Sequence, residues 1–331
     1  PLRPIEGSDS AVLHLEHNVL HFPKSHSSYD AFYDRFRSLK SDDLASIHML
    51  HIGGSHVQAG VFSNQMRSNL RAYTTKGEVG RGIIFPFSVM GTNGAKDIRC
   101  TSTGKWTKSR NIEQSPTSLL GLAGASVTTT DLSSSITFSQ VPPFENLLLY
   151  GSSLVDTALV IPVLVVEGDT IYPPLASEEV GYEYLLPHPA SEFTLAFVGD
   201  SCGSFALRGI IPEPYASGLM YTASGINGAA VPSWLRCTEF EQELSAVAPD
   251  LVLFAIGIND ANVQSFSPDR FKENYRALIA RIRRCNPDCT FLFITNNDCY
   301  LSLRRRRKTF NPNTVKVQKA FIELAEEYKS C

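Results

Sequence analysis

The sequence has no long hydrophobic run, little net charge and few cysteines. Its 331 residues include no apolar segment long enough to cross a bilayer, and a formal net charge of −3 gives no general attraction to nucleic acid or anionic membranes. The seven cysteines are an odd number without metal-ligand spacing, too few for a disulfide scaffold. Cys285 and Cys289 fit a local disulfide and two free thiols equally well. With 43% hydrophobic residues, we expect a soluble globular protein. We also expect no metal and no cofactor.

Histidine is absent from the later part of the chain. All eight histidines lie at or before His188. The one dense basic run, Arg304 to Lys308, lies between polar segments. Because such runs are usually solvated, we interpret it as an exposed loop and not as a polyanion site. The chain shows no internal repeat and no low-complexity tract.

Strands and helices alternate in two separated parts of the chain. Residues 46–52 suit a buried strand, Gly53-Gly54-Ser55 breaks it, and Val57 to Leu70 has the pattern of a helix. A second strand–loop–helix unit begins near Leu219, and its loop is Gly225-Ile226-Asn227-Gly228. Leu251 to Ile256 is a continuous apolar run, typical of a parallel strand covered on both faces. It leads directly into another glycine-containing polar loop.

The remaining C-terminal segments continue the alternation. Ser267-Pro268 predicts a helix start, and Asn286-Pro287 ends the helical pattern. Thr290 to Thr295 suits a buried strand, and a last helix is expected from about Asn313 to Tyr328. Alternating strands and helices with polar loops after the strands predict an α/β fold with a doubly wound, flavodoxin-like parallel sheet, its site along the carboxyl edge.

The middle of the chain has a different pattern. Between about residues 81 and 214, short runs rich in serine, threonine, valine and aromatics are separated by glycine and proline turns. This pattern predicts an all-β sandwich inserted into the α/β domain. We therefore expect residues 1–80 and 215–331 to form one discontinuous α/β domain and residues 81–214 to form the inserted domain.

Three polar loops at three predicted strand ends carry Ser55, Gly228 and Asn259. Ser55 stands behind two glycines at a strand-to-helix turn, which would expose its hydroxyl for acyl transfer. A serine that only caps a helix is the alternative. In a parallel sheet these loops converge on one edge. The backbone N–H groups of Ser55 and Gly228 and the Asn259 amide would then supply three donors to a tetrahedral oxyanion.

At these loops the chain resembles the SGNH (GDSL-like) serine hydrolase family. Gly53-Gly54-Ser55-His56 is similar to its first block, Gly-Asp-Ser, with Gly54 in place of the aspartate. Gly225-Ile226-Asn227-Gly228 is similar to the second, which carries an oxyanion glycine, and Gly257-Ile258-Asn259-Asp260 to the third, Gly-x-Asn-Asp. The resemblance implies that Ser55 is the nucleophile. It also implies an oxyanion hole formed by Ser55, Gly228 and Asn259. Candidate supporting residues are His56, Asn227 and Asp260.

The resemblance extends to peptidoglycan and polysaccharide O-acetylesterases that carry a β-sandwich between the first two blocks. The run Gly80 to Phe87, followed by Thr92-Asn93-Gly94, looks like the beginning of that sandwich. The resemblance implies a carbohydrate-binding-like inserted domain, an acetylated polysaccharide as the partner, and a periplasmic or extracellular location. From the net charge and the lack of long apolar runs we expect no nucleic-acid partner and no membrane span, and no protein partner is evident.

A second serine matches the family string literally. Val198-Gly199-Asp200-Ser201 contains Gly-Asp-Ser, but Pro212 and Pro214 follow and no helical pattern does. Because a nucleophile turn needs a helix after it, we interpret Ser201 as part of the inserted domain. Ser55 remains the predicted nucleophile.

The family's fourth block, Asp-x-x-His, has no counterpart in the sequence. A serine hydroxyl needs an adjacent base at neutral pH, and imidazole is the usual one. His56 is next to Ser55 on the same turn, so it would point elsewhere and contact substrate or support the loop. We expect the catalytic aspartate and histidine to lie beyond Cys331. A natural pseudoenzyme is the alternative.

Three functions remain open at this point. The first is a serine esterase that removes O-acetyl groups from a polysaccharide such as peptidoglycan through an acyl-enzyme on Ser55. The second is a catalytically inactive glycan-binding protein that keeps the scaffold without the base. The third is an O-acetyltransferase that uses the same site.

Overall fold

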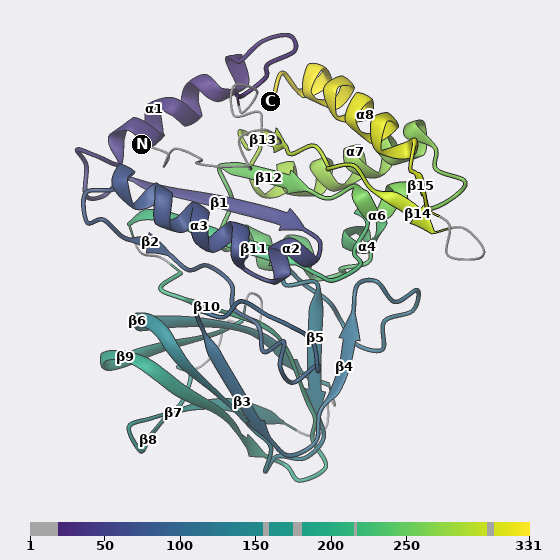
Figure 1. Cartoon of the computed structure of the whole chain (residues 1–331). Helices are drawn as coiled ribbons and strands as arrows, with labels where there is room; N and C mark the ends of the chain where they lie inside the picture. Colours follow the sequence, from purple (N-terminus) through teal and green to yellow (C-terminus); the bar gives the residue numbers. More distant parts are fainter. Residues whose placement is uncertain (1–18, 155–158, 175–180, 215–216, 303–307) are drawn as a thin grey trace, which may run out of the picture.

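The computed structural model describes residues 19–154, 159–174, 181–214, 217–302 and 308–331. Within this part of the chain, a layered α/β region lies against a region of antiparallel strands (Figure 1). The N-terminal and C-terminal segments build the α/β region, and the middle of the chain builds the other. This arrangement fits the discontinuous division that the sequence predicts, although the boundaries at residues 80 and 215 stay predictions.

The α/β region is built on a five-stranded sheet in which every neighbouring pair is parallel. Its spatial order is β13-β12-β1-β11-β2. The strands are β1 (Ser46–Gly53), β2 (Val79–Gly80), β11 (Gly218–Gly225), β12 (Leu251–Ala255) and β13 (Thr290–Phe293). The predicted parallel sheet is confirmed, and the apolar run from Leu251 is a central strand beside β1, as expected.

Helices cover both faces of this sheet. Ile47 and Met49 of β1 pack with the helix α1 (Asp30–Ser38) and Leu70 on one side. Leu50 and Ile52, which alternate with them along the strand, belong to the core on the other side. That core is covered by the helices α4 (Val231–Leu235), α5 (Phe240–Ser245), α7 (Pro268–Cys285) and α8 (Asn313–Tyr328).

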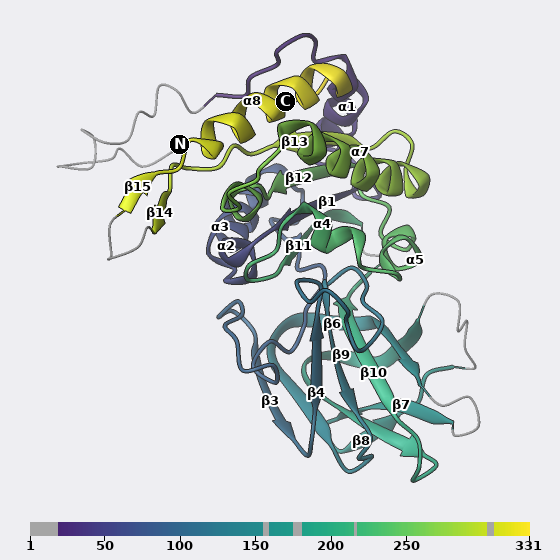
Figure 2. The ribbon, with the colours of Figure 1, turned by 90° about the vertical axis from the view of Figure 1, so that its right-hand side faces the viewer.

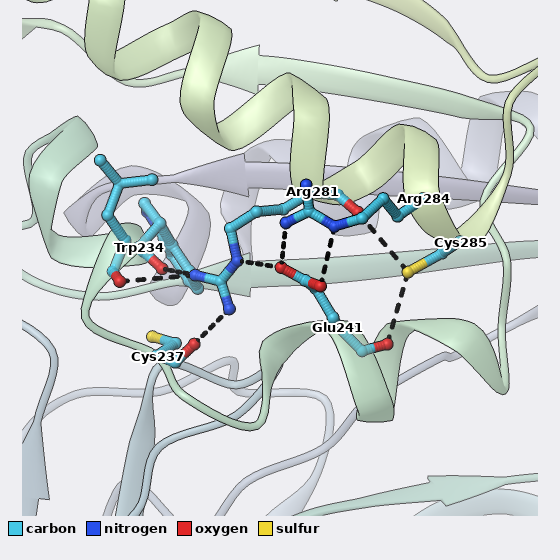
Figure 3. Close-up of polar contacts among 7 residues, drawn as sticks. Trp234, Cys237, Glu241, Arg281, Arg284 and Cys285 are labelled. Atoms are coloured by element: carbon cyan, nitrogen blue, oxygen red, sulfur yellow. Dashed lines mark hydrogen bonds and ion pairs between the residues drawn. The ribbon is translucent and has the colours of Figure 1, made fainter.

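The long helix α7 forms where its sequence signals place it. The Ser267 hydroxyl accepts a hydrogen bond from the backbone N–H of Arg270 at 3.4 Å, and Pro268 occupies the first turn. Its buried face consists of the apolar residues at helical spacing, namely Phe271, Tyr275, Leu278, Ile279 and Ile282. On the polar side, Arg281 and Arg284 both bind Glu241 of α5, at 2.7 Å and 2.6 Å (Figure 3). These contacts fix α7 against α5.

The single helix predicted from Val57 to Leu70 is wrong. The chain forms a four-residue helix α2 (Ser55–Gln58) and then α3 (Val61–Leu70). Between them Gly60 has φ of +75°, a left-handed conformation that interrupts the helix and favours glycine. The helical segment therefore starts at Ser55 itself and is interrupted after one helical turn.

The middle of the chain forms eight antiparallel strands. They are β3 (Arg99–Thr103), β4 (Thr107–Arg110), β5 (Ala125–Thr129), β6 (Ser135–Ser153), β7 (Val160–Val166), β8 (Asp169–Ile171), β9 (Tyr182–Gly199) and β10 (Phe205–Pro212). The order is β4-β5-β10-β6-β9-β7-β8, with β3 also paired to β6. The long strands β6 and β9 are paired and lie side by side (Figure 2), and their register shifts near Phe144. Because hydrogen bonds link all eight strands into one sheet, the two-sheet sandwich stays a prediction.

A buried ion pair joins the two regions. Arg208 of β10 donates from Nε to Oε1 of Glu243 of α5 at 2.6 Å, and the two side chains are only 8% and 1% exposed. The second carboxylate oxygen of Glu243 accepts the backbone N–H of Leu122 at 2.7 Å. The hydroxyl of Tyr150 donates to the backbone carbonyl of Glu243. These satisfied contacts make the two regions share one continuous core.

The structure also describes the cysteines and one end of the basic run. All seven cysteines are free thiols, so Cys285 and Cys289 form no disulfide in this structure. Of the basic run, residues 304–307 lie outside the described residues, and Lys308 is exposed at the start of β15 (Lys308–Phe310), which pairs with β14 (Tyr300–Ser302). In the described residues, no helix combines the length and apolar character that a membrane span needs.

Candidate active site

The three polar loops predicted from the sequence follow strands that end side by side. In the parallel register Gly53, the last residue of β1, stands opposite Gly225 of β11 and Ala255 of β12. The loops that carry Ser55, Gly228 and Asn259 therefore leave the sheet at the same edge. The topology that the sequence predicts brings the three candidate residues to one place.

Ser55 begins the helix α2 and is exposed, whereas the glycines before it are buried. A Cβ at Gly53 would collide with the side chain of Val57, so the turn needs glycine to bring strand and helix this close. The backbone N–H groups of Val57 and Gln58 donate to the Gly54 carbonyl, which leaves the Ser55 side chain on the outer face of the turn. In the described residues its hydroxyl makes no hydrogen bond that would hold it back from a substrate.

Asn259 connects the Ser55 turn with the loop that carries Gly228. Its side-chain nitrogen donates to the Ala229 carbonyl at 2.8 Å and lies 3.5 Å from the position that a Cβ at Gly54 would take. An amide nitrogen has two hydrogens, so one remains for an oxyanion. Gly228 is exposed and has φ of +83°, a conformation that favours glycine. The geometry suits an oxyanion hole made by these loops.

A hydrogen-bond network supports the second loop from behind. The side-chain oxygen of Gln58 accepts the backbone N–H of Asn227 at 2.6 Å. The Asn227 amide donates to Thr92 Oγ1 at 2.9 Å and to Asn93 Oδ1 at 2.7 Å, and the Gln58 amide also donates to Thr92 Oγ1, at 3.2 Å. These contacts hold Asn227 in the second loop, and its supporting role at the site stays a prediction. The sequence did not indicate Gln58, because its partners come from distant parts of the chain.

Asp260 supports the same loop from the other side. Both of its carboxylate oxygens accept the backbone N–H of Val231, at 3.2 Å each, where α4 begins. Burial raises the pKa of Asp260 to about 7, and the bond from Val231 opposes that rise only in part. The residue thus holds the start of α4, just after the Gly228 loop, while it is partly protonated near neutral pH.

Two histidines lie beside the site without forming a catalytic pair in the described structure. His56 is exposed, and the desolvation that it does experience lowers its pKa. His51 is fully buried, its Nδ1 is 2.9 Å from the Tyr221 hydroxyl, and burial lowers its pKa to about 3. Both line a cavity of about 200 Å³ with Phe62 and the loop after β12. Neither has a carboxylate partner among the described residues.

Ser201 lies elsewhere. It is exposed in the turn between β9 and β10, where the backbone N–H of Gly203 donates to the Asp200 carbonyl. Both flanking elements are antiparallel strands, and no helix follows the serine. The literal Gly-Asp-Ser string thus lies in a turn that connects two strands of the antiparallel sheet, β9 and β10, which are separated by β6. Ser201 belongs to the inserted region, as the sequence interpretation predicted.

Comparisons with known proteins support the family resemblance. Residues 196–330 match the model of the GDSL-like Lipase/Acylhydrolase family. A solved structure of a peptidoglycan O-acetylesterase is similar over 94% of this chain and 84% of that chain, with a TM-score of 0.70 and 19% identity. No curated protein matches the chain.

Two further carbohydrate esterase structures show weaker likeness. An acetyl xylan esterase matches over 34% of this chain and 57% of that one, with 18% identity and a TM-score of 0.27. A family two carbohydrate esterase from Cellvibrio japonicus matches over 70% and 85%, with 10% identity and a TM-score of 0.23. These TM-scores are too low to indicate a shared fold.

Residues 196–330 thus match the GDSL-like lipase/acylhydrolase family model, and the chain as a whole shares its fold with a solved peptidoglycan O-acetylesterase. The family match includes Gly199-Asp200-Ser201 and does not include Ser55. Position in the fold distinguishes the two serines, because Ser55 follows a parallel strand beside Asn259, whereas Ser201 lies in a turn between two strands of the antiparallel sheet.

Proposed function

We propose that the protein is a serine esterase that removes O-acetyl groups from a polysaccharide such as peptidoglycan. The observation that carries the proposal is the position of Asn259, whose amide lies between the Ser55 turn and the Gly228 loop. The fold shared with a peptidoglycan O-acetylesterase supports the class of substrate. An acetylated polysaccharide as the partner, and a periplasmic or extracellular location, belong to the same proposal.

In the proposed reaction, Ser55 Oγ attacks the acetyl carbonyl and its proton passes to a base. The negative charge on the carbonyl oxygen is met by the Ser55 and Gly228 backbone N–H groups and the second Asn259 N–H. The tetrahedral intermediate then collapses, and the sugar oxygen leaves as an alcohol after it receives the proton. Water attacks the acyl-enzyme next, which releases acetate and restores Ser55.

An external base allows the role of Ser55 to be tested independently of the natural base. The measurement is hydrolysis of 4-nitrophenyl acetate with and without added imidazole, which can accept the serine proton. We expect Ser55→Ala to lose the protein-dependent rate under both conditions. Ser201→Ala is the matched control, because Ser201 is also an exposed serine in a Gly-x-Ser turn, and it should keep the rate.

Two outcomes would contradict the proposal. A loss of rate in Ser201→Ala with retention in Ser55→Ala would assign the nucleophile to the turn between β9 and β10. The absence of any Ser55-dependent rate, even with imidazole, would favour the glycan-binding alternative. That alternative has one observation in its favour, namely that no described histidine pairs with a carboxylate beside Ser55.

A further inference from the structure

A second cavity lies behind the oxyanion loop, away from Ser55. It has a volume of about 120 Å³ and lies between α3, the end of β11 and the segment that leads from β2 into the antiparallel sheet. Part of its wall is apolar and includes Ile83, Ala95, Ile98 and Ala223. The rest is polar and includes the side chains of Gln58, Ser63, Arg81, Ser88, Thr92 and Ser224.

Most of these polar side chains already have partners. Ser88 Oγ donates to the Cys100 carbonyl at 3.0 Å, Ser224 Oγ donates to the Leu122 carbonyl, and Gln58 and Thr92 belong to the network behind the oxyanion loop. Two polar atoms in the described structure do not. Ser63 Oγ and Arg81 Nη1 are buried without a hydrogen-bond partner, and their residues are 0% and 9% exposed. Buried polar groups are usually hydrogen-bonded, so these two donors are free to bind a molecule in the cavity.

The charge around the cavity is also unbalanced. Arg81 Nε donates to Asp97 at 2.9 Å, and among the described residues this carboxylate is the one acidic partner in the cluster. Arg67 lies one helical turn after Ser63 on α3 and is 6% exposed, and its guanidinium donates to the carbonyls of Tyr221 and Arg81. Two buried guanidinium groups therefore face one carboxylate. Hydrogen bonds to carbonyls offset part of the lost hydration of Arg67, and an anion beside the two guanidinium groups would offset more of it.

We propose that this cavity is a binding site for a small carboxylate anion of the size of acetate. The carboxylate would accept hydrogen bonds from Arg81 Nη1 and Ser63 Oγ, and the short apolar end would contact Ile83 and Ala223. The negative charge of the bound anion would balance the guanidinium of Arg67, since Asp97 already pairs with Arg81. This inference goes beyond the proposed esterase function and does not depend on it, because neither Ser55 nor Asn259 lines the cavity.

Calorimetric titration of the whole chain with sodium acetate tests the site. Ionic strength is held constant with sodium gluconate, whose anion is too large for the cavity. We expect one saturable site. Ser63→Ala should weaken acetate binding roughly tenfold or more, because it removes a hydrogen bond to a charged group. Arg81→Gln, which keeps a donor for Asp97 but removes the charge, should abolish binding.

Ser88→Ala is the matched control for Ser63→Ala. It also removes a serine hydroxyl from the cavity wall, but from one that already donates to Cys100, so acetate affinity should stay within about twofold. Thermal unfolding of each variant checks that the fold is intact. No saturable heat from acetate, or equal losses in Ser63→Ala and Ser88→Ala, would overturn the proposal and leave water as the occupant.

Acetate is also the expected product at Ser55, so the titration is repeated with Ser55→Ala. Unchanged affinity in this variant locates the binding in the second cavity, whatever the outcome of the esterase assay. Loss of the site in Ser55→Ala together with retention in Ser63→Ala would show that acetate binds only at the active site. That result would overturn the inference and leave the proposed function standing.

Discussion

The raised pKa of Asp260 predicts how stability depends on pH. Folding raises this pKa from 3.8 to about 7 because the carboxyl is buried. Because the folded protein holds this proton more tightly than the unfolded chain does, a low pH favours folding. The contribution to the free energy of unfolding is fully present below the unfolded pKa and is lost as pH rises through the folded pKa. The rise corresponds to about 4 kcal/mol in total, of which roughly 2–3 kcal/mol falls between pH 5 and pH 8.

Asp260→Asn removes this titration and keeps an oxygen to accept the Val231 N–H. We therefore expect the free energy of unfolding of the wild type, measured by urea denaturation, to fall relative to the variant by roughly 2–3 kcal/mol from pH 5 to pH 8. Other titrating groups cancel in this difference. If the two proteins show parallel pH profiles, Asp260 is not protonated in the folded state and the argument from burial is refuted.

Three further predictions concern the site and the junction of the two regions. Asn259→Ala should lower the Ser55-dependent hydrolysis of 4-nitrophenyl acetate by roughly a hundredfold to a thousandfold, as for loss of one oxyanion donor, and an unchanged rate would make Asn259 structural. Gly228→Ala should lower stability to urea by about 1 kcal/mol because its φ is left-handed. Glu243→Ala should lower it by about 3–5 kcal/mol, since Arg208 would stay buried without a partner, and a loss below about 1 kcal/mol would contradict this.

The sheet and the meeting of the three loops could be predicted because they depend on local patterns. The apolar run from Leu251 needs only neighbouring residues to specify a buried strand, and the parallel topology then brings Ser55, Gly228 and Asn259 to one edge. Helix α7 was predictable in the same way, from Ser267-Pro268 and its apolar spacing.

The features that were missed depend on contacts between distant residues or on one backbone angle. Gln58 supports the site only because Asn227 and Thr92 fold against it, which no local pattern encodes. The break at Gly60 was missed because glycine is also tolerated inside helices, so its presence does not announce a left-handed turn. The ion pair of Arg208 and Glu243 could not be predicted either, because the two residues lie in different regions of the fold and meet only after folding.

The interleaved route of the chain constrains the order in which the protein can fold. The central strand β1 pairs with β11, and the whole antiparallel region lies between them in the sequence, as in the pairing of Ser46 with Gly218. Closing so long a loop carries a large entropic cost unless the intervening chain is already compact. During synthesis, β1 therefore leaves the ribosome without its neighbour. The antiparallel region can fold first and deliver β11 beside β2 and β1, so a destabilised insert would leave the strand next to Ser55 unpaired and prone to aggregation.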